Sequence, residues 1–134
     1  MLEVQNTKVI QDAYAAFGRG DIPTLLGYMT DDIHWQPVIG SAKYVPFSGE
    51  RRGKAGVAEF FKQVAEAQDF KVFEPREFVA QGDKVVAIGH YGVVTKRTHK
   101  SFESDFVTVF TLRDGRIARF QEFTDSAGVN ATFA

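Results

Sequence analysis

Few side chains in this 134-residue sequence combine a titratable group with an apolar setting, and such groups are the ones suited to acid–base chemistry. His90 lies in the middle of the run VVAIGHYGVV, and imidazole has the ordinary pKa nearest to neutral pH. Asp125 ends the run FQEFTD, and a carboxyl group among aromatic rings has a raised pKa because burial disfavours its charge. Either residue could therefore move a proton near neutral pH. The alternatives are a surface or dimer-contact role for His90 and a turn-capping role for Asp125.

A second polar group is formed by His34 and Gln36, which alternate with apolar residues in a short predicted strand. Alternation places this pair on one face and Trp35 on the other. The pair could orient a water molecule or a substrate oxygen if it faces a pocket. Otherwise it forms the exposed side of an edge strand while Trp35 fills the core. Asp105 is a further candidate, although an isolated acid in a strand is more typical of an exposed position.

Thirteen phenylalanines are an unusual number for a chain of this length. Exposed aromatic patches are a liability, so these rings must fill a core, line a cavity or form a subunit contact. If the rings line a cavity, it would suit a small apolar molecule. The candidate substrate-binding residues are Trp35, Phe60 and Phe61 as walls, Tyr44 and Phe47 at the mouth, and Gln36 and Asp105 as polar contacts.

Apolar periodicity predicts the elements that position these side chains. A three- and four-residue period predicts a helix from Val4 to Phe17, and Asp21 is a good N-cap for a short second helix. Residues 33–36 are typical of a short strand, and residues 40–53 of an ordered loop. A further helical stripe spans Lys54 to Gln68.

Beyond that stripe the period changes to two, which is typical of half-buried strands. Asp114-Gly115 is the strongest hairpin signal in the chain. Helices followed by a meander of long antiparallel strands predict an α+β fold with the helices on one face of a curved sheet. No repeat or linker marks a second domain, so residues 1–134 are expected to form one domain. The predicted strands are 70–80, 84–97, 100–112 and 116–124.

Charge and composition restrict the possible partners. Sixteen basic and 17 acidic residues give a formal charge of −1, without the basic excess that nucleic acid binding requires. No apolar stretch approaches the roughly 18 residues of a membrane span, and the N-terminus lacks a signal peptide pattern. We therefore expect a cytoplasmic protein that binds neither nucleic acid nor membrane. Without cysteine, and with three histidines that lack ligand spacing, no metal or other cofactor is expected.

Four segments together resemble the SnoaL-like polyketide cyclase group, which is related to ketosteroid isomerase within the nuclear transport factor 2-like superfamily. They are AYAAFGRGDIPTLLGYMTDDIHWQP, GERRGKAGVAEFFKQV, GDKVVAIGHYGVV and FVTVFTLRDGRIARFQEFTD. The resemblance implies a cone-shaped fold in which three N-terminal helices pack on a curved, mostly antiparallel sheet around a closed apolar pocket. It also implies a dimer through the sheet. Because this fold hosts isomerases, dehydratases, hydrolases, cyclases and plain binding proteins, it does not imply one reaction.

The resemblance supports the candidate residues only in part. An acid at the place of Asp125 often points into the pocket in this superfamily and is catalytic in the limonene epoxide hydrolase branch. In that branch, polar residues that match His34 and Gln36 hold a water molecule. However, the epoxide hydrolases also use an arginine and a further acid from one strand. The matching strand of this sequence reads GHYG and contains neither residue. The position that matches the general base of ketosteroid isomerase holds Gln36, and an amide cannot abstract a proton. The position that matches the catalytic tyrosine of the same isomerase lies one residue from Tyr14.

Two functional hypotheses follow. The first is a cofactor-free enzyme that isomerises, cyclises or dehydrates a small carbonyl-bearing substrate, with Asp125 as acid or base and His90 or His34 as its partner. The second is an accessory protein that binds a small molecule in the same pocket without turnover. A homodimer is expected in either case. A cavity that holds Asp125 and a histidine within hydrogen-bond distance would favour the enzyme, and a cavity of rings alone would favour binding.

Overall fold

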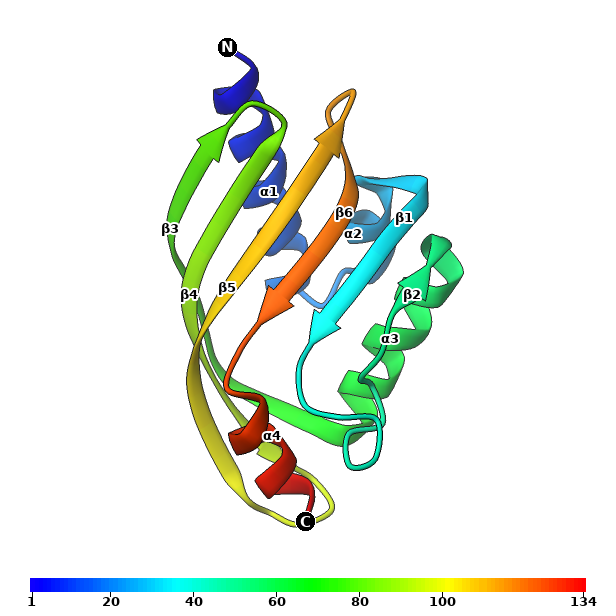
Figure 1. Ribbon diagram of the computed structural model, residues 1–134, viewed down its shortest axis with the longest axis vertical. Coiled ribbons are helices and arrows are strands. Elements are labelled where there is room, and N and C mark those ends of the chain that lie inside the picture. The colour runs from blue at the N-terminus through cyan, green and yellow to red at the C-terminus, as the bar shows by residue number, and fades with distance from the viewer.

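The chain forms an α+β fold in which a curved, mostly antiparallel sheet wraps around helices on its concave side (Figure 1). The computed structural model describes all 134 residues. The helices are α1 (Leu2–Gly18), α2 (Ile22–Gly27), α3 (Gly53–Ala67) and α4 (Ser126–Phe133). The strands are β1 (Met29–Val38), β2 (Arg51–Arg52), β3 (Gln68–Gln81), β4 (Lys84–Thr95), β5 (Ser101–Arg113) and β6 (Arg116–Phe123). The fold class predicted from the sequence is therefore confirmed.

The sheet has the strand order β2-β1-β6-β5-β4-β3. All neighbouring strands are antiparallel except β1 and β6, which run parallel and join the first strand of the chain to the last. The predicted hairpin turn connects β5 to β6, and both Asp114 and Gly115 have positive φ angles, of 53° and 76°. Positive φ at both central residues is the geometry of a type I′ turn, whose twist matches that of the flanking strands.

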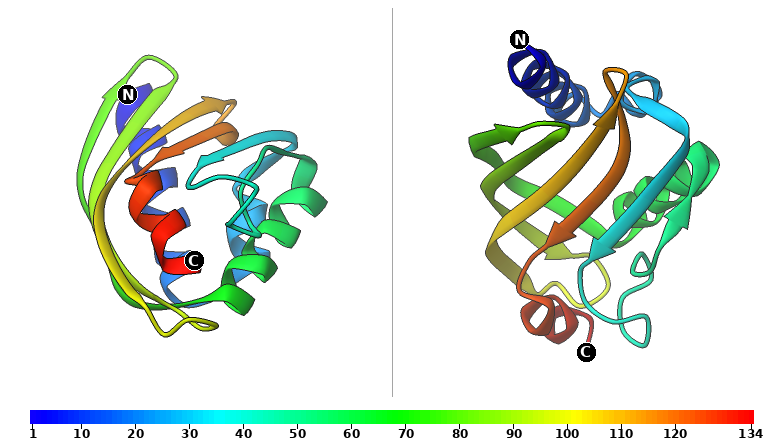
Figure 2. Two further views of the ribbon diagram at one scale, coloured as in Figure 1. Left: turned by 60° about the horizontal axis from the view of Figure 1, so that its bottom comes forward. Right: turned by 45° about the horizontal axis from the view of Figure 1, so that its top comes forward.

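The N-terminal helices begin and end close to their predicted positions. The Asp21 side chain accepts a hydrogen bond from the Thr24 amide at 3.2 Å, which caps α2 as expected. Two features differ from the prediction. The strand predicted at residues 33–36 is longer in the structure, because β1 begins at Met29, which already pairs with Ile117 of β6. A fourth helix, α4, follows β6 and packs at the end of the sheet opposite the N-terminus (Figure 2).

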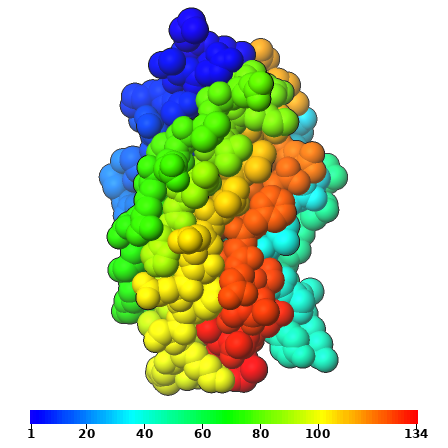
Figure 3. Space-filling view, turned by 60° about the vertical axis from the view of Figure 1, so that its left-hand side comes forward, coloured from blue at the N-terminus to red at the C-terminus, as the bar shows by residue number.

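The main core lies between the concave face of the sheet and the helices. Alternation along β4 points Ala87, Gly89 and Tyr91 inward, and β5 contributes Phe106 and Phe110 from the same face. The opposite, convex face of β3 to β6 is not covered by any helix (Figure 3). None of the four helices combines the length and the apolar character needed to span a bilayer.

Candidate functional site

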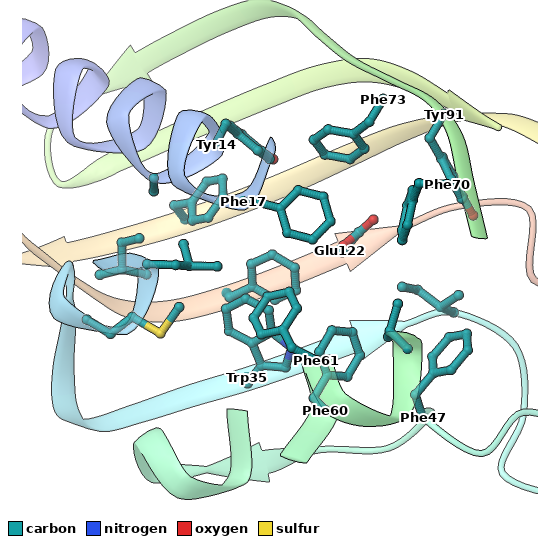
Figure 4. Close-up of a pocket in the computed structure, with 18 of the residues that line it drawn as sticks. Tyr14, Phe17, Trp35, Phe47, Phe60, Phe61, Phe70, Phe73, Tyr91 and Glu122 are labelled. Atoms are coloured by element: carbon teal, nitrogen blue, oxygen red, sulfur yellow. The ribbon is translucent and has the colours of Figure 1, made fainter. Parts of the chain in front are cut away.

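A cavity of about 80 Å³ lies between the concave face of the sheet and helices α1, α2 and α3 (Figure 4). We call it the inner cavity. Its lining is aromatic and aliphatic except for two side chains, Gln68 and Glu122. Glu122 is therefore the only carboxyl group on the cavity wall, and its side chain projects toward the rings of Phe17 and Phe70.

Glu122 faces inward because it shares a face of β6 with Phe120 two residues earlier. The parallel pairing with β1 places Phe120 beside Trp35 and Glu122 beside Pro37. A bulge on β6 precedes this stretch, since Leu112 pairs with Ile117 whereas Thr111 pairs with Arg119, two positions further along. The bulge resets the alternation, so that Ile117 before it and Phe120 after it are both buried and both line the inner cavity.

Burial raises the pKa of the Glu122 carboxyl from its ordinary value of 4.5 to about 7. Removal from water disfavours the charged carboxylate, and no neighbouring positive charge opposes this effect. A pKa close to the pH of the cell is the value at which a carboxyl group can both accept and return a proton efficiently. Glu122 thus has the ability to move a proton near neutral pH that the sequence predicted for Asp125 and His90.

Two tyrosines share the inner cavity with Glu122. The Tyr14 hydroxyl from α1 is buried without a hydrogen-bond partner. Burial raises its pKa, and the charge of Glu122 raises it further, while the nearby Thr108 hydroxyl acts in the opposite direction without reaching hydrogen-bond geometry. The Tyr91 hydroxyl pairs with the Thr124 hydroxyl at 3.0 Å, and its pKa is also raised, first by burial. Tyr14 is therefore the hydroxyl that is free to contact a ligand.

Aromatic rings form the walls predicted from the sequence. Trp35 stacks on Phe120 with ring centroids 3.6 Å apart. The ring centroids of Phe60 and Phe61 lie 5.6 and 5.4 Å from that of Trp35. Phe47 also lines the inner cavity, at the end that α4 closes. The structure thus brings together the three predicted wall residues and Phe47, which was predicted at the mouth, and their part in ligand binding stays a prediction. Tyr44, predicted at the mouth, is not part of the lining and is 45% exposed.

The polar pair His34 and Gln36 lies on the face of β1 opposite Trp35. His34 Nε2 is 3.1 Å from a Glu50 carboxylate oxygen, and the Gln36 amide donates to the other oxygen at 2.9 Å. Arg119 of β6 donates to the Gln36 side-chain oxygen at 2.8 Å. These contacts place both residues on the outside of the sheet, away from the inner cavity.

His90 and Asp105 also meet on the convex face of the sheet. His90 Nδ1 lies 3.0 Å from Asp105 and its Nε2 lies 3.3 Å from Glu103. These hydrogen bonds, that with Asp105 first, raise the pKa of His90, although the Asp105 side chain is 80% exposed. Neither residue lines the inner cavity.

Asp125 caps α4. Its side chain accepts a hydrogen bond from the Gly128 amide at 3.0 Å and is exposed. The structure therefore does not bring Asp125, His90 and His34 together, nor does it place any of them on the cavity wall. Their proposed catalytic roles stay predictions. No group of three or more histidine, aspartate or glutamate side chains is arranged to hold a metal ion.

Sequence reasoning missed Glu122, although a signal for it exists. In the run RFQEF, Phe120 and Glu122 share one face and Gln121 and Phe123 the other. Each face pairs one phenylalanine with one polar residue, so the pattern alone does not say which face is buried. The parallel contact of β6 with β1 decides it.

Comparison with known proteins gives a family and a set of similar structures. The family described as SnoaL-like domain matches residues 10–120. No curated protein matches the sequence. A nuclear transport factor 2-like protein from Burkholderia xenovorans LB400 is 31% identical, with 98% of each chain covered and a TM-score of 0.88.

Two further solved structures are similar. TerC, co-crystallised with polyporic acid, is 32% identical over 96% of this chain and 98% of its own, with a TM-score of 0.86. A protein from Xanthomonas campestris, provisionally named a polyketide cyclase, is 18% identical over the full length of both chains with a TM-score of 0.80. At that identity the last comparison supports the fold alone.

Proposed function

The chain belongs to the SnoaL-like domain family, and on that premise we propose that its inner cavity binds a flat aromatic molecule bearing a carbonyl or acidic hydroxyl group. Glu122 moves a proton on that molecule without a metal or nucleotide. The observation that carries this proposal is a lone buried carboxyl group with a pKa of about 7 in a wall of rings. Such a group has little structural purpose, because an apolar residue would fill the space without the cost of burying a charge.

The proposed chemistry uses Glu122 and Tyr14 in different roles. Ionised Glu122 accepts the proton from the carbon beside a carbonyl group, and the electron pair of that C–H bond moves to form an enolate. The unpartnered Tyr14 hydroxyl donates a hydrogen bond to the enolate oxygen, which stabilises the developing charge. Where the substrate carries a carbon–carbon double bond next to the deprotonated carbon, protonated Glu122 returns the proton to the far carbon of that double bond. The double bond then shifts into conjugation with the carbonyl group, which completes an isomerisation. Where the substrate instead carries a hydroxyl group on the next carbon, the enolate expels that group, protonated Glu122 gives it the proton, and the water that leaves completes a dehydration.

The similarity to TerC supports the ligand class. TerC was co-crystallised with polyporic acid, a flat dihydroxyquinone that carries two phenyl rings. Aromatic rings of the ligand would pack against the stacked pair Trp35 and Phe120. The oxygen atoms would reach Glu122 and Tyr14, the cavity groups that are able to accept and to donate a proton.

Deuterium exchange at the carbon beside a ketone tests the proton transfer directly. We expect the wild-type protein to accelerate exchange of 2-tetralone in D₂O, followed by ¹H NMR, with a rate that rises with pH around a midpoint of about 7 because ionised Glu122 is the base. Glu122→Gln should lower the catalysed rate by about 10²-fold or more. Asp125→Asn should leave it unchanged. Loss of exchange in Asp125→Asn but not in Glu122→Gln would instead support the sequence-based choice of Asp125.

A binding function without turnover is the second candidate, because the inner cavity offers Glu122 as its single carboxyl group. In this case a bound hydroxyl group donates to Glu122 and no carbon is deprotonated. Trp35, the only tryptophan, lies on the cavity wall, so its fluorescence reports binding. Quenching by polyporic acid without any exchange of 2-tetralone would favour this function over catalysis.

We also propose that the chain forms a homodimer through the convex face of its sheet. A row of apolar side chains crosses four neighbouring strands there, in register: Ile88, Val107, Phe123 and Val38. The last three are 38%, 42% and 46% exposed. A second copy would remove this row from water. Light scattering should show a dimer for the wild type and a monomer for Phe123→Lys, whereas a monomeric wild type would contradict the proposal.

A further inference from the structure

A second hollow adjoins the inner cavity. It is an open groove of about 820 Å³ between α1, the C-terminal end of α3 and β3, and we call it the outer groove. Seven residues line both hollows, and they include Phe17 of α1 and Phe70 and Phe73 of β3. The wall between the two spaces therefore includes aromatic side chains from both α1 and β3.

The three rings pack edge-on against one another. Centroid distances are 5.5 Å for Phe17 and Phe70, 4.9 Å for Phe17 and Phe73, and 6.0 Å for Phe70 and Phe73. Phe70 is also 39% exposed, so its outer side borders solvent. We call this trio the phenylalanine gate. Phe73 also stacks on Phe106, and Phe17 also packs on Phe61, so Phe70 is the least confined ring of the three. Rotation of Phe70 breaks no hydrogen bond, and rotations of exposed side chains are fast.

A bulge in β3 builds the gate. Residues three apart on a regular strand point to opposite faces. Phe70 pairs with Val93 and Phe73 pairs with Tyr91, so four residues of β3 lie opposite three of β4, and Lys71 has no partner in the ladder. Both rings consequently point to the concave side, where they meet Phe17. Lys71 itself borders the outer groove.

The inner cavity is too small for an aromatic ligand while the gate is closed. Its 80 Å³ is less than the roughly 150 Å³ of a cavity that accommodates benzene. Pockets that enclose larger organic ligands have roughly 300–1,000 Å³. An aromatic molecule therefore reaches Glu122 only if part of the wall moves. The phenylalanine gate lies in the part of the wall that borders the outer groove, and it contains the exposed ring of Phe70.

We propose that the ligand enters through the phenylalanine gate and that the outer groove is a second subsite, so that the site takes an elongated molecule of at least two rings. This inference rests on the proposed function. The oxygen-bearing end lies in the inner cavity beside Glu122. The remaining rings lie in the outer groove, where Gln11, Asp69 and Lys71 can contact polar substituents at the outer end.

Quenching of Trp35 fluorescence by acrylamide tests the gate without any ligand. Trp35 is 3% exposed, so quenching requires that acrylamide penetrates the wall. Phe70→Ala should raise the quenching constant several-fold. Val79→Ala, an exposed truncation on the same strand outside both hollows, should leave it unchanged. The loop position Tyr44 offers the competing route, and a rise in Tyr44→Ala with no change in Phe70→Ala would overturn the gate.

Two probes of different length test the second subsite. Polyporic acid has three rings in a row, and 2,5-dihydroxy-1,4-benzoquinone is its central ring alone. Ala65→Phe on α3 and Ala15→Phe on α1 fill the outer groove from opposite sides at exposed helix positions that do not reach the inner cavity. Ala55→Phe, also exposed on α3 but outside both hollows, is the control.

We expect Ala65→Phe and Ala15→Phe to weaken binding of polyporic acid by about tenfold or more, because burial of an outer ring is lost. Binding of the single-ring probe should not change in either variant. Unchanged affinity for polyporic acid in both filled variants would overturn the second subsite, even if the inner cavity binds it. If neither probe binds the wild type, the proposed ligand class and the second subsite both fail, and the quenching result still decides whether the gate exists.

Discussion

The ring of Phe120 lies flat against the Trp35 indole, with centroids 3.6 Å apart and planes 4° from parallel. This stack joins the first strand, β1, to the last, β6, across their parallel contact. Its consequence is chemical as well as structural. Because Glu122 follows Phe120 by two residues, the contact that buries Phe120 also holds the carboxyl group on the concave face of the sheet.

The burial of Glu122 predicts a stability that falls as the pH rises. Below pH 4.5 the carboxyl group is protonated in both the folded and the unfolded chain. Between pH 4.5 and about 7 the folded chain keeps the proton that the unfolded chain releases, so stability is lost until both states are ionised. Glu122→Gln should therefore raise the free energy of unfolding by about 3 kcal/mol at pH 8 and change it little at pH 4.

Urea denaturation at the two pH values measures this difference, and Glu59→Gln provides the control. Glu59 is an exposed glutamate on α3 that does not line the inner cavity, so its substitution should not reproduce the effect. An equal gain in stability at both pH values in Glu122→Gln would show that packing, rather than ionisation, is responsible.

The two cavity tyrosines should respond oppositely to removal of the hydroxyl group. Tyr14→Phe removes a buried group without a partner, so we expect a gain of about 1 kcal/mol or no change. Tyr91→Phe breaks the hydrogen bond to Thr124 and should cost about 1 kcal/mol. Thermal unfolding of both variants measures the contrast. If Tyr14→Phe is the more destabilising of the two, its hydroxyl has a structural role and is not reserved for a ligand.

Local patterns predicted most of the helices and strands, because the formation of a helix or strand depends on residues that are neighbours in the chain. The period-two stretches became β3 to β6, and Asp114-Gly115 became the turn between β5 and β6. The eight-residue α4 was missed, because Asp125 was interpreted only as the end of a strand. In the structure β6 ends at Phe123, and the Asp125 side chain caps the first turn of α4.

The site was harder to predict because it depends on register between distant segments. The direction in which Glu122 points is set by the pairing of β6 with β1, which lies more than 80 residues earlier. The bulge at Lys71 likewise brings Phe70 and Phe73 to one face, and no glycine marks it. His90 was selected for its chemistry, yet alternation places it opposite Tyr91 and hence on the convex face.

His90 on the convex face should titrate above its ordinary pKa. Hydrogen bonds to Asp105 and Glu103 favour the charged imidazolium. This raised pKa contributes stability that is present below pH 6.5 and is lost as the pH rises through the pKa of the folded chain. NMR titration of the imidazole should show the raised value, and Asp105→Asn should lower it toward 6.5. An unchanged titration in Asp105→Asn would exclude that carboxylate as the cause.

Asp125 should prove to be a helix cap whose substitution weakens the fold without altering the inner cavity. Its side chain accepts a hydrogen bond from the Gly128 amide, and loss of such a cap costs about 1 kcal/mol. Asp125→Ala should therefore lower the free energy of unfolding by that amount, whereas Asp125→Asn, which keeps an accepting oxygen, should lower it much less.

The titration of Glu122 in these variants separates a cap from a catalytic group. Asp125 is exposed and does not line the inner cavity, so the pKa of Glu122, followed by ¹³C NMR of its carboxyl carbon, should stay near 7 in both. A pKa that moves in Asp125→Asn, where the cap is retained, would mean that the two carboxyl groups interact. Asp125 would then belong with Glu122 in the mechanism, as the sequence first indicated.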